Sequence, residues 1–304
     1  MRIVFMGTPD FAVPSLKILL DNGYDVVGVV TAADKPGGRS GIIESAVKKF
    51  AVANGLRVLQ PLKLKDPVFL AELSELKADL QVVVAFRMLP EVVWQMPPLG
   101  TLNLHGSLLP KYRGAAPINH AIMNGETETG VTTFFLQHEI DTGDIILQRK
   151  MDIGPNEMVG EVHDRMMEMG AAVVLETVMA IENGSVKASP QPNEAATHAP
   201  KIFHETCKID FNRTAGAVHN FIRGLSPYPG AWTVLKDGKI FKVFKALPEI
   251  HSEDTIPVGS YIMPQKGVLK VKVQDGYIHL LEVQLEGKKR MAVSELLNGY
   301  KFLL

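Results

Sequence analysis

Residues 2–30, RIVFMGTPDFAVPSLKILLDNGYDVVGVV, decide the fold class of this chain. The apolar runs at residues 2–6 and 26–30 predict two buried strands. Between them, Pro14 suits the first turn of a helix, and the leucines that follow it share one helical face. A strand, a helix and a strand in this order predict a parallel sheet with a right-handed crossover. We therefore expect an α/β protein with a Rossmann-like open sheet.

The turn after the first predicted strand argues against a dinucleotide enzyme of the same fold. Such an enzyme needs the pattern G-x-G-x-x-G at this point, and only Gly7 is present. A nicotinamide-dependent enzyme is therefore only a weak alternative, because the glycine pattern that binds the dinucleotide is missing.

Further along, residues 101–117, TLNLHGSLLPKYRGAAP, place two polar side chains at the end of another predicted strand. Asn103 and His105 lie two residues apart, so they share one face of that strand. Gly106 and Pro110 then end the strand and begin a shaped loop. A single His or Asn on a strand is more often a packing or capping residue, but the loop that follows favours a functional site.

The same stretch resembles the signature of the 10-formyltetrahydrofolate-dependent formyltransferases. The resemblance rests on NLHGSLLP at residues 103–110 and on YRGAAPI at residues 112–118. The second segment is similar to that of the members that act on methionyl-tRNA. An IDTGD turn at residues 140–144 follows at the family's usual separation from Asn103. The resemblance extends over nearly the whole chain.

This resemblance implies a catalytic set of Asn103, His105 and Asp141. When an amine attacks a formyl carbon, a tetrahedral oxyanion forms, and an Asn amide can donate to it. An imidazole can exchange a proton near neutral pH, and a carboxylate can orient it. From the residues alone, Asp141 could also be a simple turn residue. Together with Asp144 it offers too few oxygen ligands for a metal ion, so no metal is predicted.

The resemblance also implies a folate site. The run LQVVVAF at residues 80–86 predicts a buried strand, and ligands of open α/β sheets bind beyond the carboxyl ends of strands. The loop after this strand is one residue shorter than in many family members. The folate-binding residues implied are Phe86, Arg87, Met88, Leu89, Ser107, Leu108, Leu109 and Pro110.

Residues 31–45, TAADKPGGRSGIIES, are rich in Gly and Pro, so we expect them to lack regular structure. Composition alone describes an ordinary surface loop. The resemblance implies instead the insertion loop that enters the acceptor end of tRNA, with Lys35 and Arg39 as its contacts. Family members often carry further lysines after this arginine. Here they are absent, and part of the phosphate contact could move to Lys48 and Lys49.

We expect a catalytic domain at residues 1–189, a Pro-rich linker at residues 190–206 and a C-terminal domain at residues 207–304. Short predicted strands separated by turn residues indicate a small barrel in the C-terminal domain, and the resemblance implies an OB-like barrel that binds tRNA. Residues 207–304 carry 14 Lys and Arg against 9 Asp and Glu, whereas residues 1–206 carry 18 against 24. A basic module on an acidic body suits a polyanionic partner, although a solvated basic face explains the charge equally well.

Composition bounds the setting of the protein. With 46% apolar and 21% charged residues, the chain is expected to be globular and soluble. No apolar run reaches the roughly 18 residues of a transmembrane helix, and the N-terminal segment lacks the features of a signal peptide. A single cysteine, Cys207, excludes an internal disulfide and suits a reducing cytoplasm. We expect a cytoplasmic monomer without membrane contact.

These observations predict transfer of the formyl group of 10-formyltetrahydrofolate to the α-amino group of methionyl-initiator tRNA, for translation initiation. No covalent enzyme intermediate is needed. Three alternatives remain open. The acceptor could be a small amine, such as a nucleotide-sugar amine or glycinamide ribonucleotide. The chain could hydrolyse the folate, with water as acceptor, or bind tRNA with an inactive site.

Overall fold

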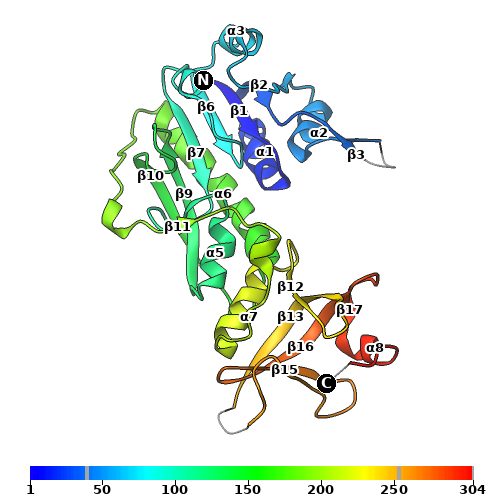
Figure 1. The fold of residues 1–304 in the computed structure, drawn as a ribbon. Coiled ribbons are helices and arrows are strands. Elements are labelled where there is room, and N and C mark those ends of the chain that lie inside the picture. The colour runs from blue at the N-terminus through cyan, green and yellow to red at the C-terminus, as the bar shows by residue number, and fades with distance from the viewer. Residues whose placement is uncertain (38–40, 252–254, 303–304) are drawn as a thin grey trace. The chain divides into compact units, whose positions relative to one another are not determined.

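The strand–helix–strand unit predicted at residues 2–30 is present in the computed structural model, which describes residues 1–37, 41–251 and 255–302 (Figure 1). It belongs to a seven-stranded sheet with the order β10-β9-β7-β6-β1-β2-β5. The strands are β1 (Arg2–Gly7), β2 (Asp25–Val30), β5 (Val58–Leu59), β6 (Leu80–Val84), β7 (Thr101–His105), β9 (Glu128–Phe135) and β10 (Ile145–Asp152).

Parallel pairing dominates this sheet. Strand β1 pairs in parallel with both β2 and β6, and β6 pairs in parallel with β7. Strand β9 adds to β7 in the antiparallel direction, which the strand–helix–strand pattern did not predict. The expected Rossmann-like α/β class is confirmed.

Helices cover the sheet, because its central strands β1 and β6 consist mostly of buried apolar residues. Every residue of β6 is buried, as expected for a strand packed on both faces. The helices of this part are α1 (Val13–Asp21), α2 (Ala46–Ala53), α3 (Pro67–Glu75), α4 (Glu91–Trp94) and α6 (Val159–Glu182), with a 3-10 helix η1 (Asp10–Ala12). Gly7 lets the chain turn closely after β1, since a Cβ there would lie 2.7 Å from the Cβ of Ala12.

The chain divides into two compact units, and neither is one continuous segment. The first contains Met1–Gly114, Gly130–Met151 and His163–His198. The second contains Ala115–Thr129, Asp152–Val162 and Ala199–Leu304. Three shorter elements lie around the predicted linker: η2 (Asn193–Ala195), β11 (His198–Ala199) and η3 (Glu205–Cys207).

The second unit is built on a six-stranded antiparallel sheet, as the short predicted strands indicated. Its strands are β12 (Ala231–Val234), β13 (Ile240–Ile250), β14 (Tyr261–Ile262), β15 (Leu269–Val273), β16 (Gly276–Leu285) and β17 (Met291–Ala292), and its helices are α5 (Pro117–Met123), α7 (Ala215–Gly224) and α8 (Val293–Leu297). The pairing of β13 with β16 shifts register around Lys245, and such irregularities bend a strand. The core includes Phe241, Val271 and Ile278.

Residues 31–45 are more regular than expected. Strands β3 (Lys35–Gly37) and β4 (Gly41–Ile43) pair in the antiparallel direction, so the prediction of no regular structure there was wrong. Gly37 makes the pairing possible, because a Cβ at this position would lie 2.5 Å from a side-chain carbon of Ile43. Arg39 lies outside the described residues.

Candidate active site

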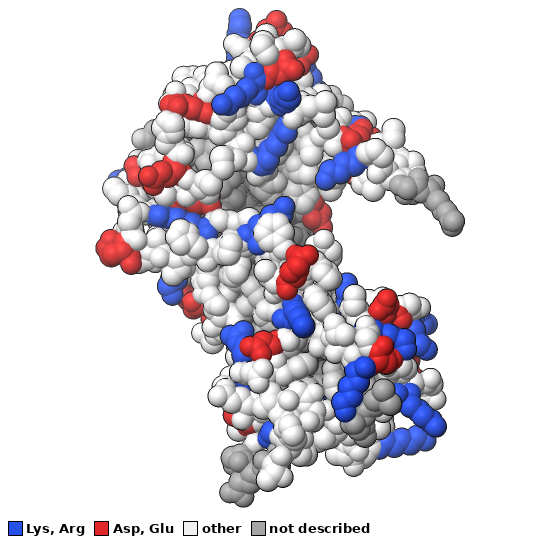
Figure 2. Space-filling model, in the orientation of Figure 1, with Lys and Arg blue, Asp and Glu red and all other residues white. Residues whose placement is uncertain are grey.

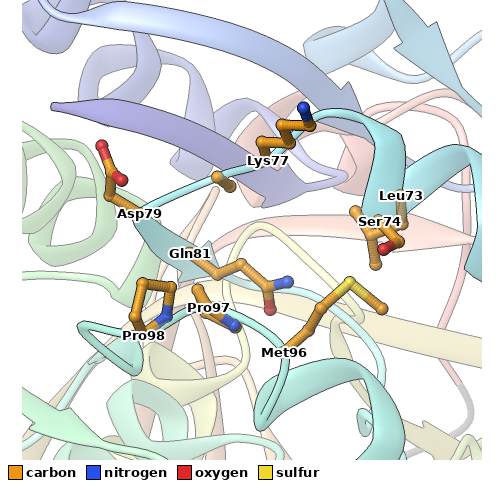
Figure 3. A pocket seen from close by; sticks show the side chains of 9 residues that line it. Leu73, Ser74, Lys77, Asp79, Gln81, Met96, Pro97 and Pro98 are labelled. Carbon is orange, nitrogen blue, oxygen red and sulfur yellow. The ribbon is translucent and has the colours of Figure 1, made fainter.

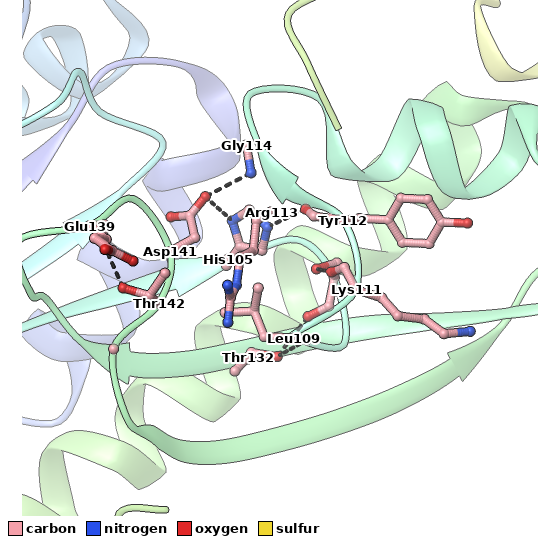
Figure 4. A network of polar contacts seen from close by, with 12 residues as sticks. His105, Leu109, Lys111, Tyr112, Arg113, Gly114, Thr132, Glu139, Asp141 and Thr142 are labelled. Atoms are coloured by element: carbon pink, nitrogen blue, oxygen red, sulfur yellow. Dashed lines mark hydrogen bonds and ion pairs between the residues drawn. The ribbon is translucent and has the colours of Figure 1, made fainter. Parts of the chain in front are cut away.

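Asn103 and His105 both lie in β7, as expected. His105, labelled in Figure 4, is the last residue of this strand. Strand β7 runs between β6 and β9, and His105 lies opposite Thr132. His105 is only 6% exposed, whereas Asn103 is half-buried. Within residues 1–37, 41–251 and 255–302, the side-chain amide of Asn103 has no hydrogen-bond partner. Its N–H groups are therefore available as donors.

The orientation of the His105 ring follows from one backbone contact. Its Nε2 lies 2.8 Å from the carbonyl oxygen of Tyr112. A carbonyl only accepts, so Nε2 carries a proton and donates it there. The other nitrogen, Nδ1, lies 3.8 Å from Oδ2 of Asp141. That distance is too long for a hydrogen bond, but it places the carboxylate beside this ring nitrogen.

The carboxylate of Asp141 is held by the loop that follows β7. Its Oδ2 accepts a hydrogen bond of 2.8 Å from the backbone N–H of Gly114. The backbone of Asp141 is left-handed, with φ at 55°, a conformation that Asp tolerates better than most residues. Gly143 is required two positions later, because a Cβ there would lie 1.7 Å from the carbonyl oxygen of Phe135.

Two residues of this site were not predicted from the sequence. Gln191 donates from Nε2 to the carbonyl oxygens of Asp141 and Gly143, at 2.9 and 2.8 Å. Arg113 donates from Nε and Nη2 to Oε1 of Gln191, at 3.1 and 2.8 Å. Both side chains are buried. Gln191 follows Asp141 by 50 residues, inside the predicted linker, so no local pattern marked it.

The predicted folate loop after β7 is anchored by Thr132, which the sequence also did not mark. The Thr132 hydroxyl donates to the carbonyl of Ser107 at 2.7 Å and accepts from the backbone N–H of Leu109 at 3.1 Å. The Ser107 hydroxyl donates to the carbonyl of Lys111 at 2.6 Å. Ser107 and Leu109 are buried, whereas Leu108 and Pro110 are partly exposed. These hydrogen bonds define the shape of the loop.

The second predicted folate segment follows β6, next to the end of β7. Met88 is 72% exposed and Phe86 is half-buried. The side chain of Leu89 packs in the hydrophobic core, so only its backbone is free to contact a ligand. The Arg87 guanidinium is turned towards the carbonyl oxygens of Pro61 and Leu62.

The pocket in Figure 3 lies elsewhere, at the start of β6 rather than at its end. Its volume is about 300 Å³. It is lined by Leu73, Ser74, Lys77, Ala78, Asp79, Gln81, Met96, Pro97 and Pro98. None of the predicted site residues is among them. Gln81 pairs with Thr101 at the start of β7, and His105 lies roughly 13 Å further along that strand.

Of the predicted tRNA contacts, Lys35 is exposed on β3. The ammonium of Lys48 forms ion pairs with Asp34 and Glu44, which compete with the phosphate contact expected there. Figure 2 shows Lys and Arg interspersed with Asp and Glu on the visible face, without a large patch of one sign.

The described part of the chain contains no group of three His, Cys, Asp or Glu side chains placed to hold a metal ion. None of its helices has both the length and the apolar composition needed to cross a membrane.

The site thus combines a buried imidazole beside a carboxylate with an unpartnered amide on the same strand. The family model described as "Formyl transferase" matches residues 1–178, and the one described as "Formyl transferase, C-terminal domain" matches residues 201–301. The methionyl-tRNA formyltransferase of Parabacteroides distasonis is 56% identical over 99% of this chain and 96% of its own. That of Flavobacterium johnsoniae is 54% identical over 99% and 97%. The chain therefore belongs to the formyl transferases, and within them to the methionyl-tRNA formyltransferase family.

Solved structures show the same fold in more distant proteins. A sugar 3N-formyl transferase, WlaRD, crystallised with dTDP and 5-N-formyl-THF, superposes with a TM-score of 0.70 at 22% identity. The match covers 95% of this chain and 99% of that one. HypX from Aquifex aeolicus, in complex with tetrahydrofolic acid, matches with a TM-score of 0.65 at 21% identity, over 98% of this chain and 47% of its own.

Proposed function

We propose that this protein transfers the formyl group of 10-formyltetrahydrofolate to the α-amino group of methionyl-initiator tRNA, with Asn103, His105 and Asp141 as its catalytic residues. The observation that carries the assignment is the His105–Asp141 pair next to the unpartnered amide of Asn103. The names of the relatives from Parabacteroides and Flavobacterium support the acceptor.

In the first step, the neutral amine attacks the formyl carbon. A carbon–nitrogen bond forms, and the electron pair of the C=O π bond moves to the oxygen. A free α-amino group has a pKa of about 7.7–8.0, so a useful fraction is already neutral near pH 7. Asn103 donates an N–H to the developing oxyanion, a contact whose loss typically lowers the rate by about 10²–10³.

In the second step, His105 moves a proton. Nε2 keeps its proton, which it donates to the Tyr112 carbonyl, so Nδ1 takes the proton from the attacking nitrogen. Asp141 stabilises the imidazolium that forms. When the tetrahedral centre collapses, the bond to the folate nitrogen breaks and Nδ1 returns the proton to it. General acid–base assistance of this kind contributes about 10²–10⁴ in rate.

The folate would lie beyond the carboxyl ends of β6 and β7. These strands are neighbours and parallel, so the loop with Ser107, Leu108, Leu109 and Pro110 and the segment with Phe86, Arg87, Met88 and Leu89 leave the sheet at the same edge. We assign pterin recognition to backbone groups of the second segment, because Leu89 points into the core and Arg87 contacts backbone carbonyls.

The tRNA would contact two regions, the β3–β4 segment through Lys35 and Arg39, and the C-terminal domain at residues 207–304. The excess of Lys and Arg in that domain supports this assignment. We further propose the division into a catalytic domain at residues 1–189, a linker at 190–206 and this C-terminal domain, and a cytoplasmic monomer.

The test is incubation with 10-formyltetrahydrofolate and methionine-charged initiator tRNA, scored for formyl-methionyl-tRNA. Uncharged initiator tRNA and charged elongator methionine tRNA run alongside. Product from the charged initiator alone is the expected result. Folate consumption without that product would move the assignment to a small amine or to water as acceptor. Binding of tRNA without turnover would indicate an inactive site.

A further inference from the structure

Gln191 lies in the segment predicted as a linker, yet every donor and acceptor of its side-chain amide is hydrogen-bonded. The side chain is 8% exposed. Its two N–H groups go to the carbonyl oxygens of Asp141 and Gly143, and its oxygen accepts from Nε and Nη2 of Arg113. This is the whole hydrogen-bonding capacity of a Gln side chain. A spacer residue does not need such a set of contacts.

The two carbonyls that Gln191 holds belong to the turn that presents the Asp141 carboxylate. Asp141 has a left-handed backbone, and the backbone of Gly143 lies so close to the Phe135 carbonyl that no side chain fits there. Such conformations persist when the surrounding structure holds them. A small rotation of this turn would carry the carboxylate away from His105, from which it is already separated by 3.8 Å.

Arg113 connects the two sides of the same turn. Its side chain bonds Gln191, which holds the Asp141 carbonyl. The next residue, Gly114, donates its N–H to the Asp141 carboxylate. Arg113 Nη2 also donates to Oδ1 of Asn193 at 2.8 Å. Gly114 thus holds the Asp141 carboxylate directly, and Arg113 supports the Asp141 backbone through Gln191.

We propose that Gln191 is a positioning residue of the formyl-transfer reaction, which orients the Asp141 carboxylate towards Nδ1 of His105 by binding the carbonyls of its turn. The kinetic part of this proposal rests on the proposed function. The hydrogen bonds of Gln191 go to Arg113 and to the turn that carries Asp141, so its effect reaches the reaction through that turn.

Two substitutions distinguish the role of the Gln191 N–H donors from that of its oxygen acceptor. Gln191→Leu removes both donors and the acceptor at nearly the same volume. Gln191→Glu keeps an acceptor for Arg113 but cannot donate to the two carbonyls. We expect kcat to fall by about 10-fold or more in both, because a displacement of the order of 1 Å in a catalytic group is costly. The KM values for folate and tRNA should stay close to wild type.

The matched control is Asn193→Ala. It removes another hydrogen bond of Arg113 but leaves the hydrogen bonds from Gln191 to the carbonyls of Asp141 and Gly143 in place. We expect its kcat to be close to that of the wild type. Wild-type kcat in Gln191→Glu, with a folded structure by circular dichroism, would overturn the proposal. If Gln191→Leu fails to fold, the kcat of Gln191→Glu still tests the positioning role.

A second measurement does not depend on turnover. In protein with isotope-labelled histidine, the His105 ring signal is assigned by its loss in His105→Gln, and its chemical shift is compared between variants at one pH. Asp141→Asn should change this chemical shift, since the carboxylate 3.8 Å from Nδ1 is replaced by a neutral amide. Gln191→Leu and Gln191→Glu should change it in the same direction, because they displace the same carboxylate. A chemical shift that changes in Asp141→Asn but in neither Gln191 variant refutes the positioning role. If the wild type makes no formyl-methionyl-tRNA, the proposed function fails while this NMR comparison still tests the geometry.

Discussion

The imidazole Nε2 of His105 donates to the carbonyl oxygen of Tyr112 at 2.8 Å, and this bond determines which ring nitrogen can exchange a proton. Because the carbonyl has no proton to offer, Nε2 cannot act as a base while the bond is intact. Nδ1 is then the remaining basic atom, and it faces Asp141 (Figure 4). The predictions below follow from this arrangement and from the packing around it.

Asp141→Asn should lower kcat by about 10² or more, because the amide cannot stabilise the imidazolium. The amide oxygen can still accept from the Gly114 N–H, so the turn should keep its shape. Steady-state kinetics at saturating folate and tRNA check this. Asp144→Asn, in the same turn, serves as control and should keep its activity. Similar kcat values in the two variants would contradict the role of Asp141.

Asn103→Ala should lower kcat by about 10²–10³, since the donor to the oxyanion is lost. Asn103→Asp has the same shape but no N–H, and its charge would repel the oxyanion, so the loss should be at least as large. Folate affinity, measured by fluorescence titration, should be similar in all three proteins. A variant at this position with near wild-type kcat would exclude Asn103 as the oxyanion donor.

Gly143→Ala should destabilise the protein and impair catalysis together, because its Cβ would overlap the carbonyl of Phe135 and the Asp141 turn would have to move. Gly216→Ala is the matched control. Gly216 lies in α7 with open space around its Cα, and Ala in a helix is favoured over Gly by about 0.5–1 kcal/mol. Calorimetry should show a lower melting temperature for the first variant and an equal or higher one for the second.

Stability should fall in mild acid because of His219. Burial, with a further contribution from neighbouring Arg223, lowers the pKa of His219 from 6.5 to about 4. Between these values the unfolded chain binds a proton that the folded chain excludes. The contribution is therefore fully present above pH 6.5 and is lost as the pH falls towards 4, up to about 3 kcal/mol.

Urea unfolding at pH 7.5, 6 and 4.5 would measure this loss. His219→Gln has no titrating group at this position, so its stability should depend less on pH over the same range. An identical pH dependence in the wild type and His219→Gln would show that other groups cause the acid sensitivity.

Lys35→Ala should weaken tRNA binding and reduce the slope of log affinity against log salt by about 1, as for the loss of one phosphate contact. Filter binding at several salt concentrations measures both effects. Lys17→Ala is the control, since Lys17 is exposed on α1 and paired with Asp21. Equal salt slopes for Lys35→Ala and the wild type would show that Lys35 does not contact a tRNA phosphate.

Much of the framework could be predicted because it follows from local periodicity. The largely apolar runs at β1 and β6 predicted strands buried on both faces. Asn103 and His105 share a face of β7 because side chains alternate along any strand. The β3–β4 pairing was missed, since its glycines, which usually break strands, here permit close contact.

The sequence by itself determined most of the elements and the expected catalytic groups Asn103, His105 and Asp141, because both depend on neighbouring residues. Only the tertiary structure decided how those groups face one another. The Tyr112 carbonyl selects the proton-bearing nitrogen of His105, and Gln191 reaches Asp141 across 50 residues. Hydrogen bonds depend on distance and direction in space, and residues far apart in the chain acquire these only when the sheet and its loops have packed.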